Sequence, residues 1–147
     1  MCFNAVPCDA PRFRWAAVMT AVSECIFCDY ADTERHKIVA ENELAYVHYD
    51  KFPVSDGHCE VIPKAHIVSY FDLTADQLAA MHELAKEVAE LWEEKYCPDG
   101  YTLGVNEGEA AGRSVHHVHF HIIPRYLGDV ESPRGGIRHI IPGKGNY

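Results

Sequence analysis

Three histidines alternate with apolar residues in one stretch of the chain, which reads His117, Val118, His119, Phe120, His121 and Ile122. Successive side chains of a β-strand point to opposite faces, so the three imidazoles are expected on one face, roughly 6–7 Å apart between successive members, with the apolar residues turned into a core. A single histidine in a strand is usually an ordinary surface or core residue. Three in alternation, beside the glycine-containing loop 107–114, indicate a functional site instead.

Two kinds of chemistry suit such a row of imidazoles. A His-x-His pair with a nearby carboxylate is a known metal site, but the residues after His121 are Ile, Ile, Pro and Arg, so the expected carboxylate is missing there. Alternatively, a neutral imidazole attacks phosphorus and forms a labile phosphoramidate, which divides one difficult displacement into two easier ones. Neighbouring imidazoles and the Ser114 hydroxyl would then bind phosphoryl oxygens or move a proton.

Two longer blocks of sequence carry a resemblance to a known family. Residues 105–125, VNEGEAAGRSVHHVHFHIIPR, and residues 57–66, GHCEVIPKAH, resemble the signature blocks of the histidine-triad (HIT) family, and the similarity covers about residues 25–125. The resemblance implies that His119 is a nucleophile that becomes nucleotidylated. It would attack the α-phosphate of a nucleoside phosphoramidate or a dinucleoside polyphosphate. Water would then release a nucleoside monophosphate, whereas phosphate as the acceptor would make the protein a phosphorylase.

The same resemblance assigns roles to the residues around the nucleophile. The backbone carbonyl of His117 would orient the second ring nitrogen of His119 and thereby aim the other nitrogen at phosphorus. His121 and Ser114 would contact the α-phosphate or assist the leaving group. Asn106, just before the loop, would touch ribose or phosphate.

Further residues are expected to bind the nucleotide. Asp50 matches the family carboxylate that binds ribose hydroxyls, for which an acceptor-only group is suited. Gly112 would let the loop backbone approach an anionic oxygen. Arg113 stands where family members commonly have glutamine; its permanent, forked cation suits phosphate and favours a longer polyphosphate chain. The purine base is expected against apolar residues near Ile26, Phe27 and Val47.

A Cys-x-x-Cys motif at Cys25 and Cys28 predicts a structural zinc site. A closed tetrahedral site needs two more ligands. One branch of the resembled family, and its distant uridylyltransferase relatives, supply two histidines, which correspond to His58 and His117. His66 is an alternative ligand, but we expect it to be a neighbour of the site.

Turn signals divide the chain into five strands and one long helix. Thr74 is the expected N-cap of a helix over 74–96, with Gln77 completing a capping box, and one apolar stripe follows, made of Leu78, Met81, Ala85, Val88 and Trp92. Strands are predicted where β-branched and aromatic residues gather, namely as two strands within 36–50 and as single strands over 57–62, 101–106 and 115–123.

This order of elements predicts an α+β fold, an antiparallel sheet of about five strands with one long helix and a short helix packed on it. We expect a single domain over 23–147, with an irregular tail over 126–147 that is rich in glycine and proline. Residues 1–22 are interpreted as an accessory or disordered extension.

Composition narrows the class of protein further. The formal net charge of −9 argues against a general nucleic-acid binder, because such a protein needs a basic surface. A small purine nucleotide remains a suitable substrate. No apolar run reaches the length of a membrane span, and the apolar run 15–22 is too short for a signal sequence, so a cytoplasmic protein is expected. The family resemblance implies a homodimer.

Two other functions remain open from the sequence. One is a zinc-stabilised, nucleotide-binding regulatory protein with weak or vestigial catalysis. The other is an enzyme that processes nucleic-acid ends, which would need a basic surface or an added finger module; neither is visible.

Overall fold

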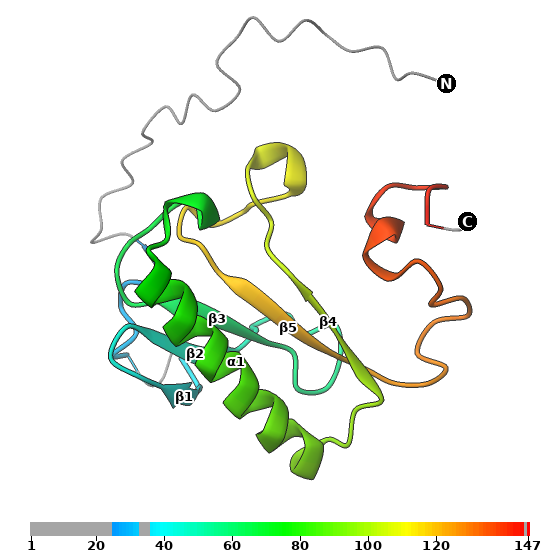
Figure 1. Ribbon diagram of the computed structural model, residues 1–147, viewed down its shortest axis with the longest axis horizontal. Helices are drawn as coiled ribbons and strands as arrows, with labels where there is room; N and C mark the ends of the chain where they lie inside the picture. Colours follow the sequence, from blue (N-terminus) through cyan, green and yellow to red (C-terminus); the bar gives the residue numbers. More distant parts are fainter. Residues whose placement is uncertain (1–24, 33–35, 146) are drawn as a thin grey trace, which may run out of the picture.

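The computed structural model describes residues 25–32, 36–145 and 147. A five-stranded antiparallel sheet and one long helix form its framework (Figure 1), which confirms the predicted α+β fold. The strands are ordered β1-β2-β3-β5-β4 across the sheet. The elements, in chain order, are β1 (Ile38–Glu41), β2 (Ala45–Tyr49), β3 (Cys59–Pro63), α1 (Ala75–Lys95), β4 (Gly100–Gly104) and β5 (Phe120–Arg125). The shorter helical pieces are 3₁₀ turns at Tyr70–Asp72, Glu109–Ala111 and Gly136–Ile140.

Local chemistry explains where the main elements begin and end. The Thr74 hydroxyl accepts from the Gln77 amide while the Gln77 side chain accepts from the Thr74 amide, so both halves of the predicted capping box are present. The turn between β1 and β2 is closed by Asn42, whose Oδ1 accepts from the amides of Leu44 and Ala45 at 3.1 and 2.9 Å. This side chain takes up backbone donors that the tight turn leaves unpaired.

The apolar stripe of α1 packs on one face of the sheet. Its fully buried members are Ala80, Met81, Leu84, Val88 and Trp92. Leu78 and Ala85, which the sequence also placed in the stripe, are only partly buried at its edge. The Trp92 indole donates to the carbonyl oxygen of Gly57 at 2.7 Å and so ties the helix to the turn before β3.

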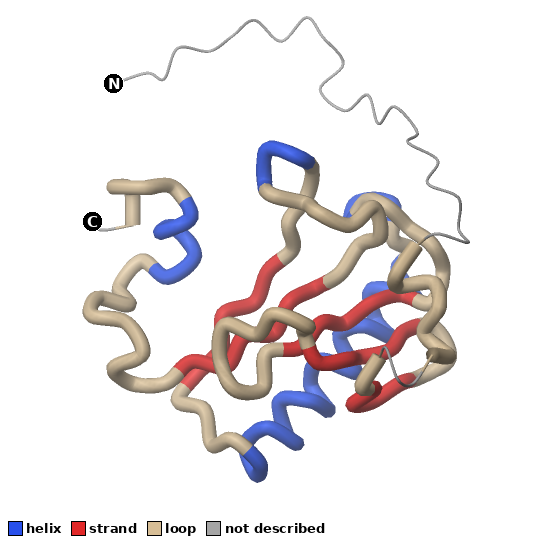
Figure 2. The backbone as a smooth tube through the Cα atoms, turned by 180° about the vertical axis from the view of Figure 1, so that it is seen from behind, coloured by secondary structure: helices blue, strands red, loops and turns tan. Residues whose placement is uncertain are grey.

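The two faces of the sheet have different roles because the strand side chains alternate. Toward α1 lie the alternate residues Ala45, Val47, Cys59, Val61, Val118 and Ile122, which form the main core. On the opposite face, seen from behind in Figure 2, a smaller cluster joins Phe27 to Tyr46 and Ile62. Residues that point to this second face therefore lie beside the segment that begins at Cys25.

The antiparallel register of β3 and β5 brings the two sequence blocks together. Glu60 pairs with His121, and Val61 pairs with Phe120. The expected strand over 115–123 is wrong at its start, because β5 begins only at Phe120. Before that point the chain leaves the ladder, and the amide of Val118 donates to the carbonyl of Ile67 at 2.7 Å instead. The first two histidines of the row therefore precede the strand.

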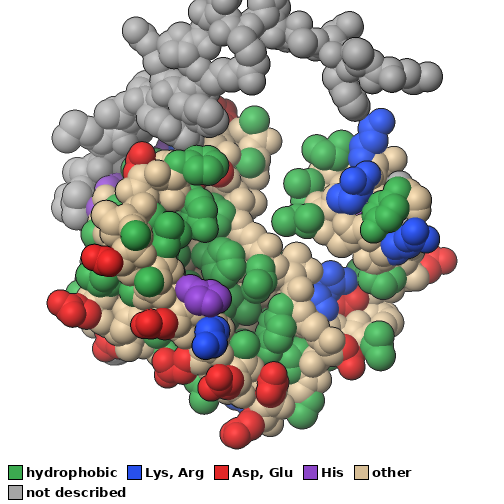
Figure 3. All heavy atoms as spheres, viewed as in Figure 1, with side chains coloured by type: hydrophobic (Ala, Val, Ile, Leu, Met, Phe, Trp, Pro, Cys, Tyr) green, Lys and Arg blue, Asp and Glu red, His purple; other side chains and the backbone are tan. Residues whose placement is uncertain are grey.

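One face of the molecule shows how its charge is distributed (Figure 3). Acidic side chains gather on and below α1, whereas Lys and Arg gather on the C-terminal segment. The exposed acids of the helix are Asp76, Glu83, Glu87, Glu90, Glu93 and Glu94. Among the described residues, no helix has the length and apolar character needed to cross a bilayer. The expected extension over 1–22 lies outside the described residues.

Candidate functional site

A cavity of about 1210 Å³ opens on the sheet face opposite α1. Most of the candidate binding residues line it, namely Ile26, Phe27, Asp50, Asn106, Ser114, His119 and His121. Asn106 and Ser114 are exposed. The site is thus built from β2, β3, β5, the loop before β5 and the segment that follows Cys25.

The ring of His119 is fixed by a backbone carbonyl. Its Nδ1 lies 2.8 Å from the carbonyl oxygen of His117, so Nδ1 must carry the hydrogen that makes this bond. In a neutral ring the lone pair then resides on Nε2. The edge-to-face contact with Phe27, with ring centroids 5.3 Å apart, holds the imidazole from the side. Nε2 of His119 is therefore the ring atom whose lone pair is free to act as a nucleophile or a ligand.

A second chain of contacts gives His121 the opposite tautomer. The amide of Val54 donates to Nδ1 of His58 at 3.3 Å, which leaves the His58 hydrogen on Nε2. That atom lies 3.0 Å from Nδ1 of His121, so Nδ1 of His121 accepts and its own hydrogen is on Nε2. Burial lowers the pKa of both His58 and His121, which keeps the two rings neutral. His121 is thus a hydrogen donor beside a lone-pair nucleophile.

A buried carboxylate that sequence analysis missed lies next to both rings. Glu60 is 6% exposed, and its Oε1 is 3.5 Å from Nδ1 of His121 and 3.9 Å from Nε2 of His119. Its Oε2 accepts from Nε2 of His48 at 2.9 Å, and Nδ1 of His48 is 3.1 Å from Nδ1 of His36. Burial by itself would raise the pKa of Glu60, but the His48 hydrogen bond and the nearby imidazoles outweigh it and lower the pKa.

The carboxylate that a His-x-His metal site would require is therefore present in space, although none follows His121 in sequence. The feature of the sequence that could have identified Glu60 is its position in an otherwise apolar strand, Cys59–Pro63. A charged residue in such a strand is buried only with partners. Those partners come from β2 and β5, which no local pattern could supply.

Asp50, the expected ribose ligand, directly follows β2. Its Oδ1 accepts from the amide of Phe52 at 2.6 Å, and its Oδ2 is 3.4 Å from Nε2 of His58. Gly112 has a φ of 85°, a left-handed conformation that side chains rarely adopt. Gly112 does not line the cavity in this structure.

Two residues that were expected near the nucleotide, Arg113 and Val47, do not line the cavity. The side chain of Arg113 is 7% exposed and lies outside the cavity lining, because its Nη1 donates to the carbonyl of Val68 and to Glu107 at 3.1 and 3.2 Å. Val47 points to the α1 side of the sheet because its neighbours Tyr46 and His48 point to the other. Arg113 therefore anchors its loop, and Val47 belongs to the main core.

A cysteine and histidine cluster lies at the other end of the histidine row. Cys25, Cys28, His66 and His117 offer ligand atoms that all lie within 4.8 Å of one another. Nδ1 of His117 is 3.4 Å from Sγ of Cys25 and 3.6 Å from Sγ of Cys28, and Nδ1 of His66 is 3.2 Å from the latter sulfur. Nε2 of His117 donates to the carbonyl of Pro63 at 2.8 Å, which leaves the Nδ1 lone pair facing the thiols.

The cluster corrects the expected ligand set, since His66 and not His58 lies beside the cysteines. The β3–β5 register explains the difference, because it runs antiparallel from Glu60 opposite His121 and so brings His117 to the end of β3 that leads to His66. His58, at the other end of β3, contacts His121 instead. Two thiols and two imidazoles are the donor set of a closed zinc site, so these four residues could hold zinc.

Burial sets the proton affinities in this cluster. It lowers the pKa of His117 to about 4, and together with Cys25 it raises the pKa of the Cys28 thiol to about 11. Without a metal both groups are therefore neutral at pH 7. Bringing two thiols and two neutral imidazoles together stabilises little by itself, which is consistent with a site shaped for a cation that displaces the thiol protons.

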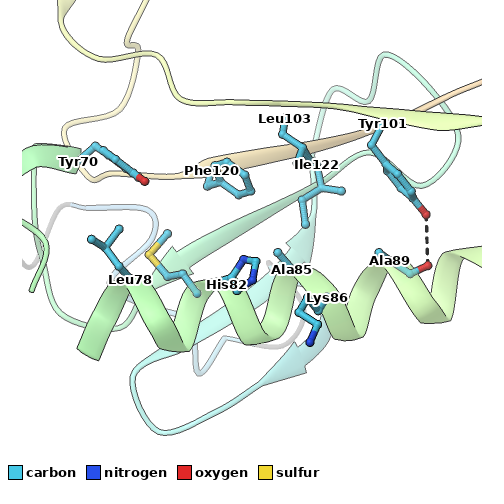
Figure 4. A pocket seen from close by; sticks show the side chains of 11 residues that line it. Tyr70, Leu78, His82, Ala85, Lys86, Ala89, Tyr101, Leu103, Phe120 and Ile122 are labelled. Atoms are coloured by element: carbon cyan, nitrogen blue, oxygen red, sulfur yellow. Dashed lines mark hydrogen bonds between the residues drawn. The ribbon is translucent and has the colours of Figure 1, made fainter. Parts of the chain in front are cut away.

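A second hollow, of about 280 Å³, lies between α1 and the β4–β5 edge of the sheet (Figure 4). Its lining is mostly apolar, with His82 and Lys86 on the helix side. The Tyr101 hydroxyl donates across the hollow to the carbonyl of Ala89 at 3.2 Å. The residues that line this hollow include no cluster of metal ligands or of reactive side chains, so the larger cavity is the candidate functional site.

Comparison with known proteins agrees with this geometry. The chain is 42% identical over 107 residues to an uncharacterized 16.1 kDa HIT-like protein of Mycoplasma pneumoniae, covering 72% of this chain and 74% of the relative. It is 35% identical to the adenosine 5′-monophosphoramidase hnt1 of Schizosaccharomyces pombe, over 69% of this chain and 74% of that one.

A solved structure and a family model lead to the same family. The crystal structure of a zinc-bound histidine triad family protein from Mycobacterium smegmatis superposes with a TM-score of 0.67 and 30% identity, covering 76% of this chain and 82% of that one. The model of the HIT domain matches residues 32–128. The chain described here is therefore a member of the HIT domain family.

Proposed function

We propose that this protein is a nucleotide hydrolase or transferase that attacks the α-phosphate of its substrate with Nε2 of His119. One observation carries the proposal. Two neighbouring imidazoles face the same cavity, and their hydrogen bonds give their neutral forms opposite tautomers, with a lone pair on Nε2 of His119 and a hydrogen on Nε2 of His121. A nucleophile beside a hydrogen-bond donor to the phosphoryl oxygens suits displacement at phosphorus.

The reaction proceeds in two steps. Nε2 of His119 forms a bond to phosphorus while the bond to the leaving group breaks. The Nε2 hydrogen of His121 donates a hydrogen bond to a phosphoryl oxygen, and the leaving oxygen or nitrogen takes its proton from water. The nucleotidyl-imidazole is positively charged, and the His117 carbonyl stabilises it through Nδ1–H. Water then attacks phosphorus, the N–P bond breaks with its electron pair returning to Nε2 of His119, and the proton of the attacking water is released to the solvent. The Ser114 hydroxyl, at the cavity wall, donates to a phosphoryl oxygen.

The substrate class we favour is a purine nucleoside phosphoramidate. Asp50 binds the ribose hydroxyls, and the base packs against Ile26 and Phe27 at the cavity wall. Arg113 was the residue that pointed to a longer polyphosphate, and it is engaged outside the cavity. The similarity to an adenosine 5′-monophosphoramidase supports the same choice. Dinucleoside polyphosphates remain the alternative substrates to be compared.

The experiment incubates the protein with adenylated and guanylated phosphoramidates and with dinucleoside polyphosphates. Mass spectrometry should find a nucleotidyl group on the peptide that contains His119. Replacement of this nucleophile, His119→Ala, should reduce turnover by at least about a thousandfold while nucleotide binding is retained. His139→Ala, which removes an exposed histidine outside both hollows, is the matched control and should leave turnover unchanged.

The competing hypothesis is a zinc-stabilised nucleotide-binding regulatory protein. It predicts that His119→Ala changes neither turnover nor binding, since any residual hydrolysis would not depend on this ring. A wild-type protein that binds nucleotide but never carries a nucleotidyl adduct would therefore contradict the enzymatic proposal.

Two further properties belong to the same proposal. Zinc is held by Cys25, Cys28, His66 and His117 in a structural role, because four ligands leave no open position for substrate. A homodimer forms through α1 and the edge strand β4, as the family resemblance implies. The mostly apolar hollow of Figure 4 lies between these two elements and supports that interface.

A further inference from the structure

We infer that Glu60 is a specificity-determining residue that favours singly charged α-phosphates and expels the doubly charged nucleoside monophosphate product. The inference rests on the proposed function, since it assumes that phosphorus meets Nε2 of His119. Glu60 takes no part in the two proposed reaction steps, although its Oε1 is 3.9 Å from Nε2 of His119. A carboxylate in this place repels the anionic phosphate that the site must bind. We therefore looked for a step of the reaction in which this repulsion is useful.

The charge of Glu60 is held in position by its neighbours. Oε2 accepts from Nε2 of His48 at 2.9 Å, and His48 is backed by His36 at 3.1 Å between their Nδ1 atoms. These three side chains are all buried. The carboxylate therefore has no room to turn away when a phosphate arrives, and Oε1 stays directed at the two catalytic rings.

Among the described residues, no Lys or Arg forms an ion pair with Oε1. Its neighbours are His121 at 3.5 Å and His119 at 3.9 Å. His121 is kept neutral by burial, which lowers its pKa. His119 must present a lone pair on Nε2 in order to attack. The carboxylate is thus a fixed negative charge on the wall of the phosphate subsite.

Distance and charge together produce the discrimination. Reacting atoms lie about 3–3.5 Å apart before attack, so phosphoryl oxygens on phosphorus come within a few ångströms of Oε1. The α-phosphate of the substrate is linked on two sides and carries one negative charge. The released monoester carries about −1.5 to −2 at pH 7. The repulsion is therefore stronger for product than for substrate, and it adds to the driving force for product release.

A general-base role for Glu60 is inconsistent with the geometry. The attacking water must approach phosphorus roughly in line with the breaking N–P bond, from the side opposite the nucleophile. Glu60 lies on the nucleophile's own side, next to Nε2 of His119. Its effect on the reaction is therefore electrostatic.

The test compares two probes that differ by one negative charge and one methyl group at the α-phosphate, so the effect of Glu60 is read from the change that its substitution makes to their affinity ratio. Adenosine 5′-monophosphate and its phosphate methyl ester, with the guanosine pair alongside, are titrated by calorimetry at pH 7.5 without added divalent cation. The wild-type protein should bind the methyl ester about tenfold more tightly than the monophosphate, as expected for one extra charge at this range. Glu60→Gln keeps the shape and removes the charge, and it should abolish this preference. In Glu60→Gln, inhibition by the nucleoside monophosphate product should strengthen to a similar extent.

Two further variants control for fold and overall charge. Glu60→Asp retains the charge and should retain a preference in the wild-type direction, even if the substitution lowers stability. Glu41→Gln removes one negative charge at a carboxylate that is 55% exposed and paired with Lys64. It should bind both probes as the wild-type protein does, because Glu41 is outside the cavity lining.

Three other results would contradict either the role of Glu60 or the proposed function. A preference unchanged in Glu60→Gln would overturn the inference, and so would a preference that appears only with added Mg²⁺, because Glu60 would then act as a metal ligand. The proposed function fails differently, namely if neither probe binds and His119 is never nucleotidylated.

Discussion

At the scale of residues, two backbone groups decide which ring nitrogen carries the hydrogen in His119 and in His121. The carbonyl of His117 fixes the hydrogen of His119 on Nδ1, and the amide of Val54 fixes that of His58, and through it that of His121. The same side-chain type thereby provides a lone pair at one position and a hydrogen at the next. The division requires neutral rings, and burial lowers the pKa of both His58 and His121.

The buried ring of His117 should make the zinc-free protein less stable in acid. Its pKa is about 4 in the folded chain and 6.5 in its ordinary state, so as pH falls below 6.5 the unfolded chain binds this proton first. The free energy of unfolding should decrease between pH 6.5 and 4 and lose no more from this group at lower pH. The loss is up to about 3 kcal/mol.

Urea unfolding at pH 7, 5.5 and 4 measures this loss after chelation of metal. In His117→Asn the part of the decrease due to this ring should be absent. His82→Asn, at an exposed position of α1, should follow the wild-type curve. An equally steep decrease in His117→Asn would show that other groups, such as His58 and His121, cause all of the acid sensitivity.

At the scale of elements, the register of β3 against β5 assembles both sites. It places Glu60 opposite His121 at one point and brings His117 near the end of β3 at another. The segment from Cys25 to Phe27 then touches both sites, because Cys25 contacts His117 and Phe27 contacts His119. The cysteine and histidine cluster thus adjoins a wall of the larger cavity.

Substitution of a proposed zinc ligand tests this coupling. Cys25→Ser should reduce bound zinc from about one equivalent per chain to near zero, as measured by elemental analysis, since a closed site needs all four ligands. The Michaelis constant for a nucleotide substrate should rise because Phe27 loses its anchor. Cys97→Ser, which changes an exposed cysteine, should alter neither quantity. Unchanged zinc stoichiometry in Cys25→Ser would rule out this ligand set.

At the scale of the whole molecule, one face of the sheet carries the candidate site, and the edge strand β4 has a strand neighbour on one side only. β4 is a terminal strand of the sheet, and Leu103 on it is 48% exposed beside the apolar hollow along α1. An exposed strand edge beside apolar surface is a place where a second chain can pair. The proposed homodimer would cover it.

A charge placed on this edge should therefore separate the subunits. Light scattering should give twice the chain mass for the wild-type protein and about 16.5 kDa for Leu103→Asp. Leu127→Asp, at a position 87% exposed outside the hollow, is the matched control and should remain dimeric. If Leu103→Asp had the wild-type mass, the interface would have to lie elsewhere.

Local patterns in the sequence were sufficient to determine the strands, the capped helix and the alternation that turns Val118 and Ile122 away from His119. These features follow from the period of a strand or a helix, which nearby residues alone determine. The tertiary structure decided which histidine lies beside the cysteines, that Glu60 and His48 lie beside the nucleophile, and that Arg113 is engaged elsewhere. Those contacts depend on strand register and chain direction, which join residues far apart in sequence and leave no local period to detect.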